Sequence, residues 1–163
     1  MNKIEEWKKR RKKARRENVK YVKSLSKKNK RKGLNEIANK MHEEVFKTID
    51  CLDCANCCSS IPPIVTATDS KRIAKYMGMK LADFREQYII EDEDGDMVMN
   101  QTPCPFLEKN NYCEIYEVRP KACRQYPHTD NSDFVQNLHL HAQNAQYCPA
   151  VFHILEKMKA NFV

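Results

Sequence analysis

The clearest hydrophobic periodicity in the chain predicts two long helices. Over residues 34–49, apolar side chains recur at intervals of three and four residues, the spacing of one helix face. A second segment opens with Pro149, which favours the first turn of a helix. Behind it, Val151, Phe152, Leu155 and Met158 follow at helical spacing. We predict that the first helix packs over the region that begins at Cys51.

Shorter elements are predicted between these two helices. Residues 68–70 (Thr-Asp-Ser) offer N-cap chemistry for a helix at about 69–77, and Gly78 would end it. Another short helix is predicted at 81–89, with apolar residues on one face. Asp94-Gly95, between two apolar triplets, is typical of a tight hairpin turn. The fold class that follows is mainly α, with one or two short β-hairpins.

Charge divides the chain into two parts. Residues 1–33 hold 16 Lys and Arg against three Glu, whereas the remaining residues hold 13 basic and 19 acidic side chains. The net charge of +7 therefore comes from the N-terminal segment. Gly33 marks a reasonable boundary. We predict a basic, helical N-terminal tail over 1–33 and a cysteine-cluster domain over 34–163.

The basic tail also has a narrow apolar stripe, which Arg11 and Asn18 interrupt. A weakly amphipathic, mostly cationic helix is expected there. Three interpretations stay open: a solvated tail, attraction to nucleic acid or another polyanion through its phosphates, and binding at a membrane surface. The stripe consists of Ile4, Trp7, Ala14, Tyr21, Val22 and Leu25.

Composition excludes several functions and directs attention to the cysteines. Only three glycines are present, and no glycine-rich phosphate loop occurs, so nucleotide-binding folds built on such loops are not expected. The basic start is not followed by an apolar segment, and no transmembrane segment is visible. We therefore expect a cytoplasmic location, where thiols stay reduced. Eight cysteines in that setting indicate metal, redox or catalytic chemistry rather than disulfides.

Four of the cysteines form the run CLDCANCC, at positions 51, 54, 57 and 58. Two residues between cysteines allow a tight turn to bring two sulfurs to one metal. Here this gap occurs twice and is followed by an adjacent pair. Because neighbouring side chains diverge, Cys57 and Cys58 are not expected to bind the same ion in a simple way. The predicted metal ligands of this run are Cys51, Cys54, Cys57 and Cys58.

The other four cysteines are dispersed along the chain. Proline follows two of them, which stiffens the chain and removes a backbone donor. Residues 103–116 are predicted to form a hairpin that turns at 109–111 and brings two cysteines close together. Eight thiolates suffice for two four-sulfur sites, or for one site with spare thiols. The dispersed cysteines, also predicted ligands, are Cys104, Cys113, Cys123 and Cys148.

The repeated two-residue spacing and the two Cys-Pro steps favour an iron–sulfur cluster over zinc, which is the second possibility. Three residues near Cys123 are candidates for cofactor or substrate binding: Arg119, Arg124 and Tyr126, with His128 beside them. With enough thiols available, no histidine is predicted to be a ligand.

The remaining histidines are placed by their spacing. His139 and His141 have the spacing that puts both side chains on one face of a strand. His42 and His153 fall on predicted helices. Core or surface positions are commoner for histidine than metal ligation, so we expect such positions here.

The assembled motif resembles a known family. CxxCxxCC at 51–58, PCPFL at 103–107, CEIYEVRPKACRQYP at 113–127 and the late Cys-Pro together are similar to the YkgJ-type cysteine-cluster family. That family is described as a zinc- or iron-chelating domain and is distantly similar to flagellin lysine methylases. The resemblance covers roughly residues 50–150. It implies a small metal-stabilised domain in which all eight cysteines are ligands.

The first functional hypothesis is therefore a metal-binding protein with a redox, structural or metal-handling role. An alternative is a metal-dependent enzyme related to protein lysine methylases, although no usual methyltransferase cofactor loop is present. Another is a nucleic-acid-associated protein that uses its basic tail. The sequence does not decide whether the protein is an enzyme.

Overall fold

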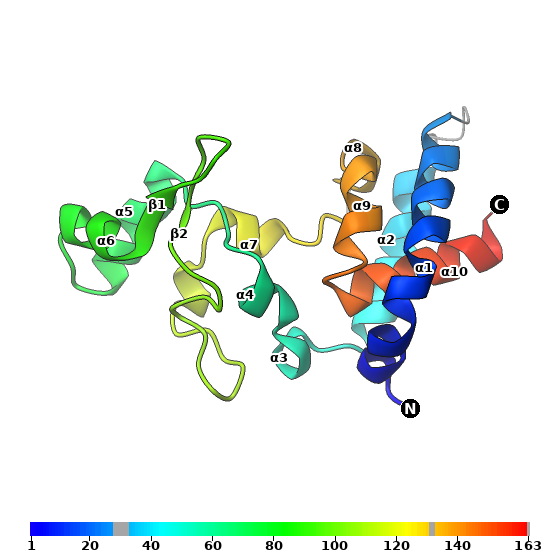
Figure 1. Cartoon of the computed structure of the whole chain (residues 1–163), viewed down its shortest axis with the longest axis horizontal. Coiled ribbons are helices and arrows are strands. Elements are labelled where there is room, and N and C mark those ends of the chain that lie inside the picture. Colours follow the sequence, from blue (N-terminus) through cyan, green and yellow to red (C-terminus); the bar gives the residue numbers. More distant parts are fainter. Residues whose placement is uncertain (28–32, 131–132, 163) are drawn as a thin grey trace. The chain divides into compact units, whose positions relative to one another are not determined.

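The computed structural model describes residues 1–27, 33–130 and 133–162 (Figure 1). Contacts group the chain into two compact units. The first, here the terminal unit, consists of Met1–Cys54 and Pro127–Val163, and the second, the central unit, consists of Ala55–Tyr126. Residues 1–33 therefore do not separate from the rest of the terminal unit in this grouping. That they act as a distinct functional segment stays a prediction.

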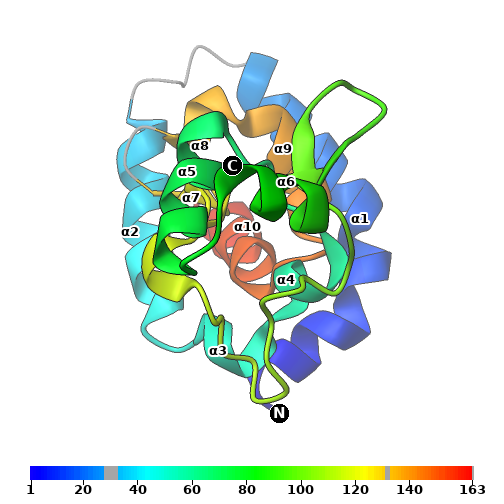
Figure 2. The same ribbon diagram turned by 90° about the vertical axis from the view of Figure 1, so that its left-hand side faces the viewer.

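The terminal unit is a small helical bundle. In Figure 2 α10 lies between α1 and α2, and it contacts both of them. It is correspondingly the most buried helix of the unit. The helices predicted over 34–49 and from Pro149 are confirmed as α2 and α10, although α2 ends at Phe46. The helices are α1 (Lys3–Lys27), α2 (Leu34–Phe46), α3 (Cys51–Cys54), α8 (Asp133–Gln136), α9 (Leu138–Asn144) and α10 (Pro149–Asn161).

The α1 helix is part of the core of this unit. The Trp7 side chain is 1% exposed, and its indole N–H donates to the Ala145 carbonyl at 2.9 Å. Arg11, predicted to interrupt the apolar stripe, lies with its guanidinium 4.4 Å from the Trp7 ring centroid. Asn18 is fully buried and accepts a hydrogen bond from Lys159. The interpretation of residues 3–27 as a solvated tail is wrong, because packing uses both interrupting residues; residues 28–32 lie outside the described residues.

The central unit combines short helices with one hairpin. Strands β1 and β2 pair antiparallel, with Ile90 opposite Val98. Its small core gathers side chains from α5, α6, β2 and the loops that follow, among them Ile73, Phe84 and Phe106. The elements are α4 (Asn56–Ser60), α5 (Ala67–Tyr76), α6 (Leu81–Tyr88), β1 (Ile89–Glu91), β2 (Met97–Met99), a 3-10 helix η1 (Tyr116–Val118) and α7 (Lys121–Gln125).

Local predictions in this unit are confirmed with one correction. The turn at Asp94-Gly95 joins β1 to β2, and Gly95 has a φ of +84°, which glycine adopts without strain. Gly78 follows α5 as predicted. The N-cap of α5, however, is Thr66, not residues 68–70. Thr66 and Asp69 form a reciprocal capping box, which moves the helix start two residues earlier.

The fold class is mainly α with a two-stranded hairpin, as predicted. The second expected hairpin, at 103–116, is reduced to a single bridge between Leu107 and Cys113. Within the described ranges, no helix has the length and apolar character needed to cross a membrane.

Candidate metal centre

Three cysteines of the central unit are brought together by backbone hydrogen bonds. The Cys104 N–H donates to the Cys58 carbonyl at 2.8 Å, which joins the loop after β2 to α4. The chain then turns back, with the Glu108 N–H donating to the Tyr112 carbonyl at 2.8 Å. This turn, at the predicted residues 109–111, pairs Leu107 with Cys113. Segments far apart in sequence therefore meet around Cys58, Cys104 and Cys113.

The fourth cysteine of this unit, Cys123, lies on α7. The segment that leads to α7 is held by Arg72 of α5, whose guanidinium donates to the carbonyls of Val118 and Arg119. The same Arg72 is paired with Asp69 at 2.6 Å. Asp69 also accepts from the backbone N–H of Lys121 at 3.2 Å. One buried carboxylate and one guanidinium thus fix the chain between Cys113 and Cys123, a role that the sequence analysis did not foresee.

These four thiols share one electrostatic environment. Burial raises the pKa of Cys104 to about 11 and that of Cys123 to about 12, and it also raises the pKa of Cys113. In each case the neighbouring Cys58 adds to the rise through its negative charge. A hydrogen bond with the Cys57 thiol instead lowers the pKa of Cys58 to about 7. We call Cys58, Cys104, Cys113 and Cys123 the tetrathiol group.

Arg119 stands beside this group. Its guanidinium lies 4.0 Å from the Tyr116 ring centroid and donates to the Tyr116 carbonyl at 2.7 Å. Its positive charge acts to lower the pKa of Cys113 and Cys123, against the larger effect of burial. Arg124 is exposed on α7, and Tyr126 is half-buried just after it. That Arg119, Arg124 and Tyr126 bind a cofactor or substrate stays a prediction.

The terminal unit contains a second, smaller set of thiols. Burial raises the pKa of Cys148 to about 12, and the charges of Cys51 and Cys54 add to the rise. Cys51 and Cys54 stand at the two ends of α3, and Cys148 is the N-cap residue of α10. The Cys148 N–H donates to the Asn144 carbonyl at 2.8 Å, which fixes the chain just before Pro149. We call these three cysteines the trithiol group.

His42, His141 and His153 pack within the terminal unit, and one prediction about the histidines is wrong. His139 and His141 lie on α9, where two residues apart point to different faces, not on a strand. His141 is fully buried, stacks on Phe134 and approaches the Phe134 carbonyl with Nε2 at 2.8 Å. Burial lowers its pKa to about 4. His42 and His153 lie on helices, as predicted, and contact Thr129 and the Lys3 carbonyl.

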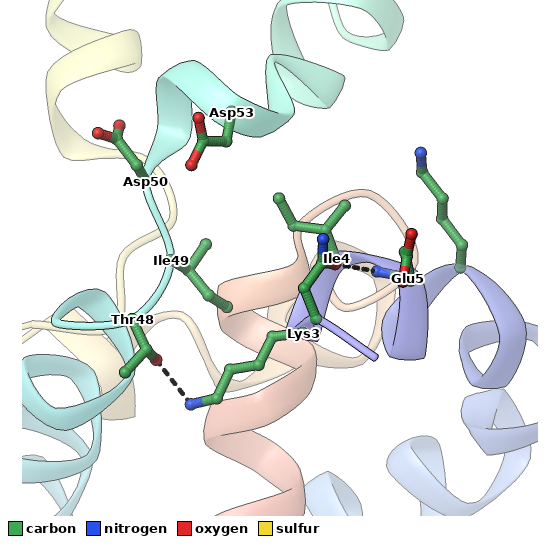
Figure 3. Close-up of a pocket in the computed structure, with 9 residues that line it drawn as sticks. Lys3, Ile4, Glu5, Thr48, Ile49, Asp50 and Asp53 are labelled. Carbon is green, nitrogen blue, oxygen red and sulfur yellow. Dashed lines mark hydrogen bonds between the residues drawn. The ribbon is translucent and has the colours of Figure 1, made fainter.

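A pocket of about 300 Å³ lies in the terminal unit beside the start of α3 (Figure 3). Lys3 crosses it and donates to the Thr48 hydroxyl at 2.7 Å. Asp50, which precedes Cys51, and Asp53, which precedes Cys54, line the same pocket. Its lining comes from the N-terminal part of α1, the segment between α2 and α3, and α3 itself, so sequence periodicity does not reveal it.

The donor chemistry of the cysteines fits the metals that thiolates select. Sulfur ligands are typical of zinc and of iron–sulfur clusters. The tetrathiol group offers the four sulfurs that such centres use, within one unit. In residues 1–27, 33–130 and 133–162, no three His, Cys, Asp or Glu side chains are already arranged around one point as metal ligands. The fit of the tetrathiol group to such a metal therefore rests on the thiolate as the donor type and on the proximity of the four cysteines.

Comparison with known families agrees with the motifs. Residues 50–149 match the family model CxxCxxCC, described as "Putative zinc- or iron-chelating domain". The matched range contains all eight cysteines and covers more than half of the chain. The chain belongs to the CxxCxxCC family and is a metal-binding protein of the zinc or iron class. No curated protein and no solved structure gives a significant match.

Proposed function

We propose that this protein binds an iron–sulfur cluster through the tetrathiol group. The observation that carries the proposal is the convergence of four cysteines, from three stretches of the central unit, into one electrostatic environment. Four cysteine thiolates are the usual ligand set of [2Fe–2S] and [4Fe–4S] clusters. Each stretch is held in place independently of a metal, by the Cys104–Cys58 backbone hydrogen bond and by Arg72.

Two features favour iron and sulfide over a single zinc ion. Cys104 of the tetrathiol group is followed by proline, as the last cysteine of bacterial ferredoxin motifs is. The two-residue spacing occurs twice in the run at 51–58, of which Cys58 alone belongs to this group. Zinc is the other metal that the same four thiols would accept. When bound, a cluster would supply one-electron chemistry, and its potential would respond to nearby charge. The positive charge of Arg119, which acts to lower the pKa of Cys113 and Cys123, would exert that influence.

The trithiol group supplies three more of the eight predicted ligands, as a separate thiol group. Cys51, Cys54 and Cys148 belong to the terminal unit, whereas the tetrathiol group belongs wholly to the central unit. If each group acts within its own unit, loss of one trithiol cysteine will leave the metal of the tetrathiol group in place. Cys57 belongs to neither group. Its thiol hydrogen-bonds the Cys58 sulfur and thereby favours the Cys58 thiolate.

Two matched substitutions test this assignment. Cys113→Ser and Cys148→Ser each remove one half-buried thiol, one from each group. After anaerobic purification, iron, acid-labile sulfide and zinc are measured per chain. We expect Cys113→Ser to lose most of the iron and sulfide and Cys148→Ser to retain the wild-type visible spectrum. Equal loss in both variants would refute the assignment to two groups, and wild-type metal content in Cys113→Ser would refute the proposed ligand set.

A further inference from the structure

The solvent-exposed side of α1 is a continuous basic surface. Nine exposed Lys and Arg side chains lie on it, and on a helix with 3.6 residues per turn they fall within an arc of about 160°. The buried residues Trp7, Ala14 and Leu25 lie on the opposite side. We call this surface the basic ridge; it consists of Lys8, Lys9, Lys12, Lys13, Arg15, Arg16, Lys20, Lys23 and Lys27.

Internal ion pairs do not neutralise this ridge. Of the three acidic residues on α1, Glu6 pairs with Arg10, and Glu17 pairs with Lys159 of α10. Glu5, the third acidic residue, lies within the same arc as the basic side chains, near the N-terminal end of α1. Within the described part of the chain, none of the nine ridge residues takes part in an ion pair. Their charge is therefore directed toward solvent.

We propose that the basic ridge is a docking surface for the phosphate backbone of a nucleic acid. The α1 helix has 25 residues and is therefore about 37 Å long, so its charges can follow a duplex groove over several phosphates. Duplex DNA carries one negative charge per about 1.7 Å of axis. The row of positive side chains on the ridge can neutralise several of these phosphates. Lysine and arginine contacts to phosphates supply affinity without sequence preference.

The packing of α1 argues against a membrane as the partner. An interfacial helix inserts an apolar face among the lipid chains. The apolar face of α1 is already used, because Trp7, Val22 and Leu25 are buried in the core of the terminal unit. What remains for a partner is almost entirely charged, and charge alone suits a polyanion in water. This surface is independent of the proposed metal centre, since its residues lie outside the matched range 50–149.

The test uses the full-length protein with surface substitutions, because deleting α1 would remove Trp7 from the core. Lys12, Arg16 and Lys23 lie at the middle of the ridge, and all three are changed to Glu. The matched control changes Lys71, Lys75 and Lys80 to Glu: these are exposed lysines of the central unit, so the net charge falls by the same amount. Circular dichroism and Trp7 fluorescence verify that both variants fold.

Binding is measured by fluorescence anisotropy with a labelled duplex of about 20 base pairs, as RNA and as DNA, between about 50 and 200 mM salt. We expect wild-type binding to weaken steeply with salt. The ridge variant should bind about tenfold or more weakly, with a log–log salt slope smaller by about 3, and the control should bind nearly as well as wild type. If the wild-type protein binds one of the two duplexes more tightly, that preference identifies whether RNA or DNA supplies the phosphates.

Three results would overturn the proposal. Equal weakening in ridge variant and control would show a response to net charge and not to this surface. Binding that does not depend on salt would exclude a phosphate contact. Absence of duplex binding together with binding to vesicles that contain phosphatidylserine would assign the ridge to membranes instead.

Discussion

Asp69 is predicted to stabilise the central unit through four hydrogen bonds to its carboxylate. Its side chain is 1% exposed, and both carboxylate oxygens act only as acceptors. Oδ2 accepts from the backbone N–H and the hydroxyl of Thr66, and Oδ1 accepts from Arg72 and from the Lys121 N–H. In Asp69→Asn, an NH2 group replaces one of the two carboxylate oxygens, and this group can only donate. At either oxygen position it faces two hydrogen-bond donors and no acceptor.

The cost follows from the contacts that are lost. Loss of the capping interaction with Thr66 costs about 1 kcal/mol. Leaving the Arg72 guanidinium without its carboxylate costs about 2 kcal/mol, less than for a fully buried pair because the Arg72 side chain is 29% exposed. Because the amide group takes only one of the two oxygen positions, these costs do not add in full, and we expect the free energy of local unfolding of the central unit to fall by about 2 kcal/mol.

Native-state hydrogen exchange measures this change within the central unit. Amides of α5 and α7 should exchange about 30-fold faster in Asp69→Asn than in wild type, since each 1.36 kcal/mol corresponds to a factor of ten. Asp83→Asn is the matched control, because Asp83 is an exposed aspartate in the first turn of α6. Exchange in Asp69→Asn that matches the control would refute the assigned role of the carboxylate.

Three further predictions concern packing, pH and metal uptake. Trp7→Phe removes the hydrogen bond to the Ala145 carbonyl and part of a buried ring, so urea denaturation should show a free energy of unfolding lower by about 2 kcal/mol. Because the folded His141 has a pKa of about 4 and the unfolded side chain about 6.5, the unfolded chain binds more protons between these values. Stability should therefore fall by up to about 3 kcal/mol as the pH drops through this range, and His141→Asn should reduce the slope. Metal uptake near neutral pH should release at least two protons, from Cys104 and Cys123, which a pH indicator detects during titration with Zn²⁺.

Local sequence signals predicted most elements of the fold. Periodicity placed α2 and α10, and turn residues placed Gly78 and the β1–β2 turn, because these features depend on neighbours within a few residues. The start of α5 was misplaced because several consecutive residues could cap it, and the partner three positions later, Asp69, selects Thr66. His139 and His141 were assigned strand geometry because their spacing alone does not distinguish a strand from a helix.

Interactions over long sequence distances were not predictable in the same way. Arg11 and Asn18 interrupt the apolar stripe of α1, yet each finds a partner near the other end of the chain, in Gln146 and Lys159. The cysteine motifs indicated which residues are candidate ligands. The proposed division of seven of them between two groups depends on how segments fold back on each other, as in the Cys104–Cys58 hydrogen bond, which no local pattern encodes.

The central claim is that the cysteines hold an iron–sulfur cluster. Its most direct test is the wild-type protein purified without oxygen, with iron, acid-labile sulfide and zinc measured per chain beside the visible absorption spectrum. The account predicts a brown protein with comparable amounts of iron and sulfide. A colourless protein with stoichiometric zinc would contradict the choice of iron, and a protein with neither metal and fewer than eight free thiols would contradict the metal site itself.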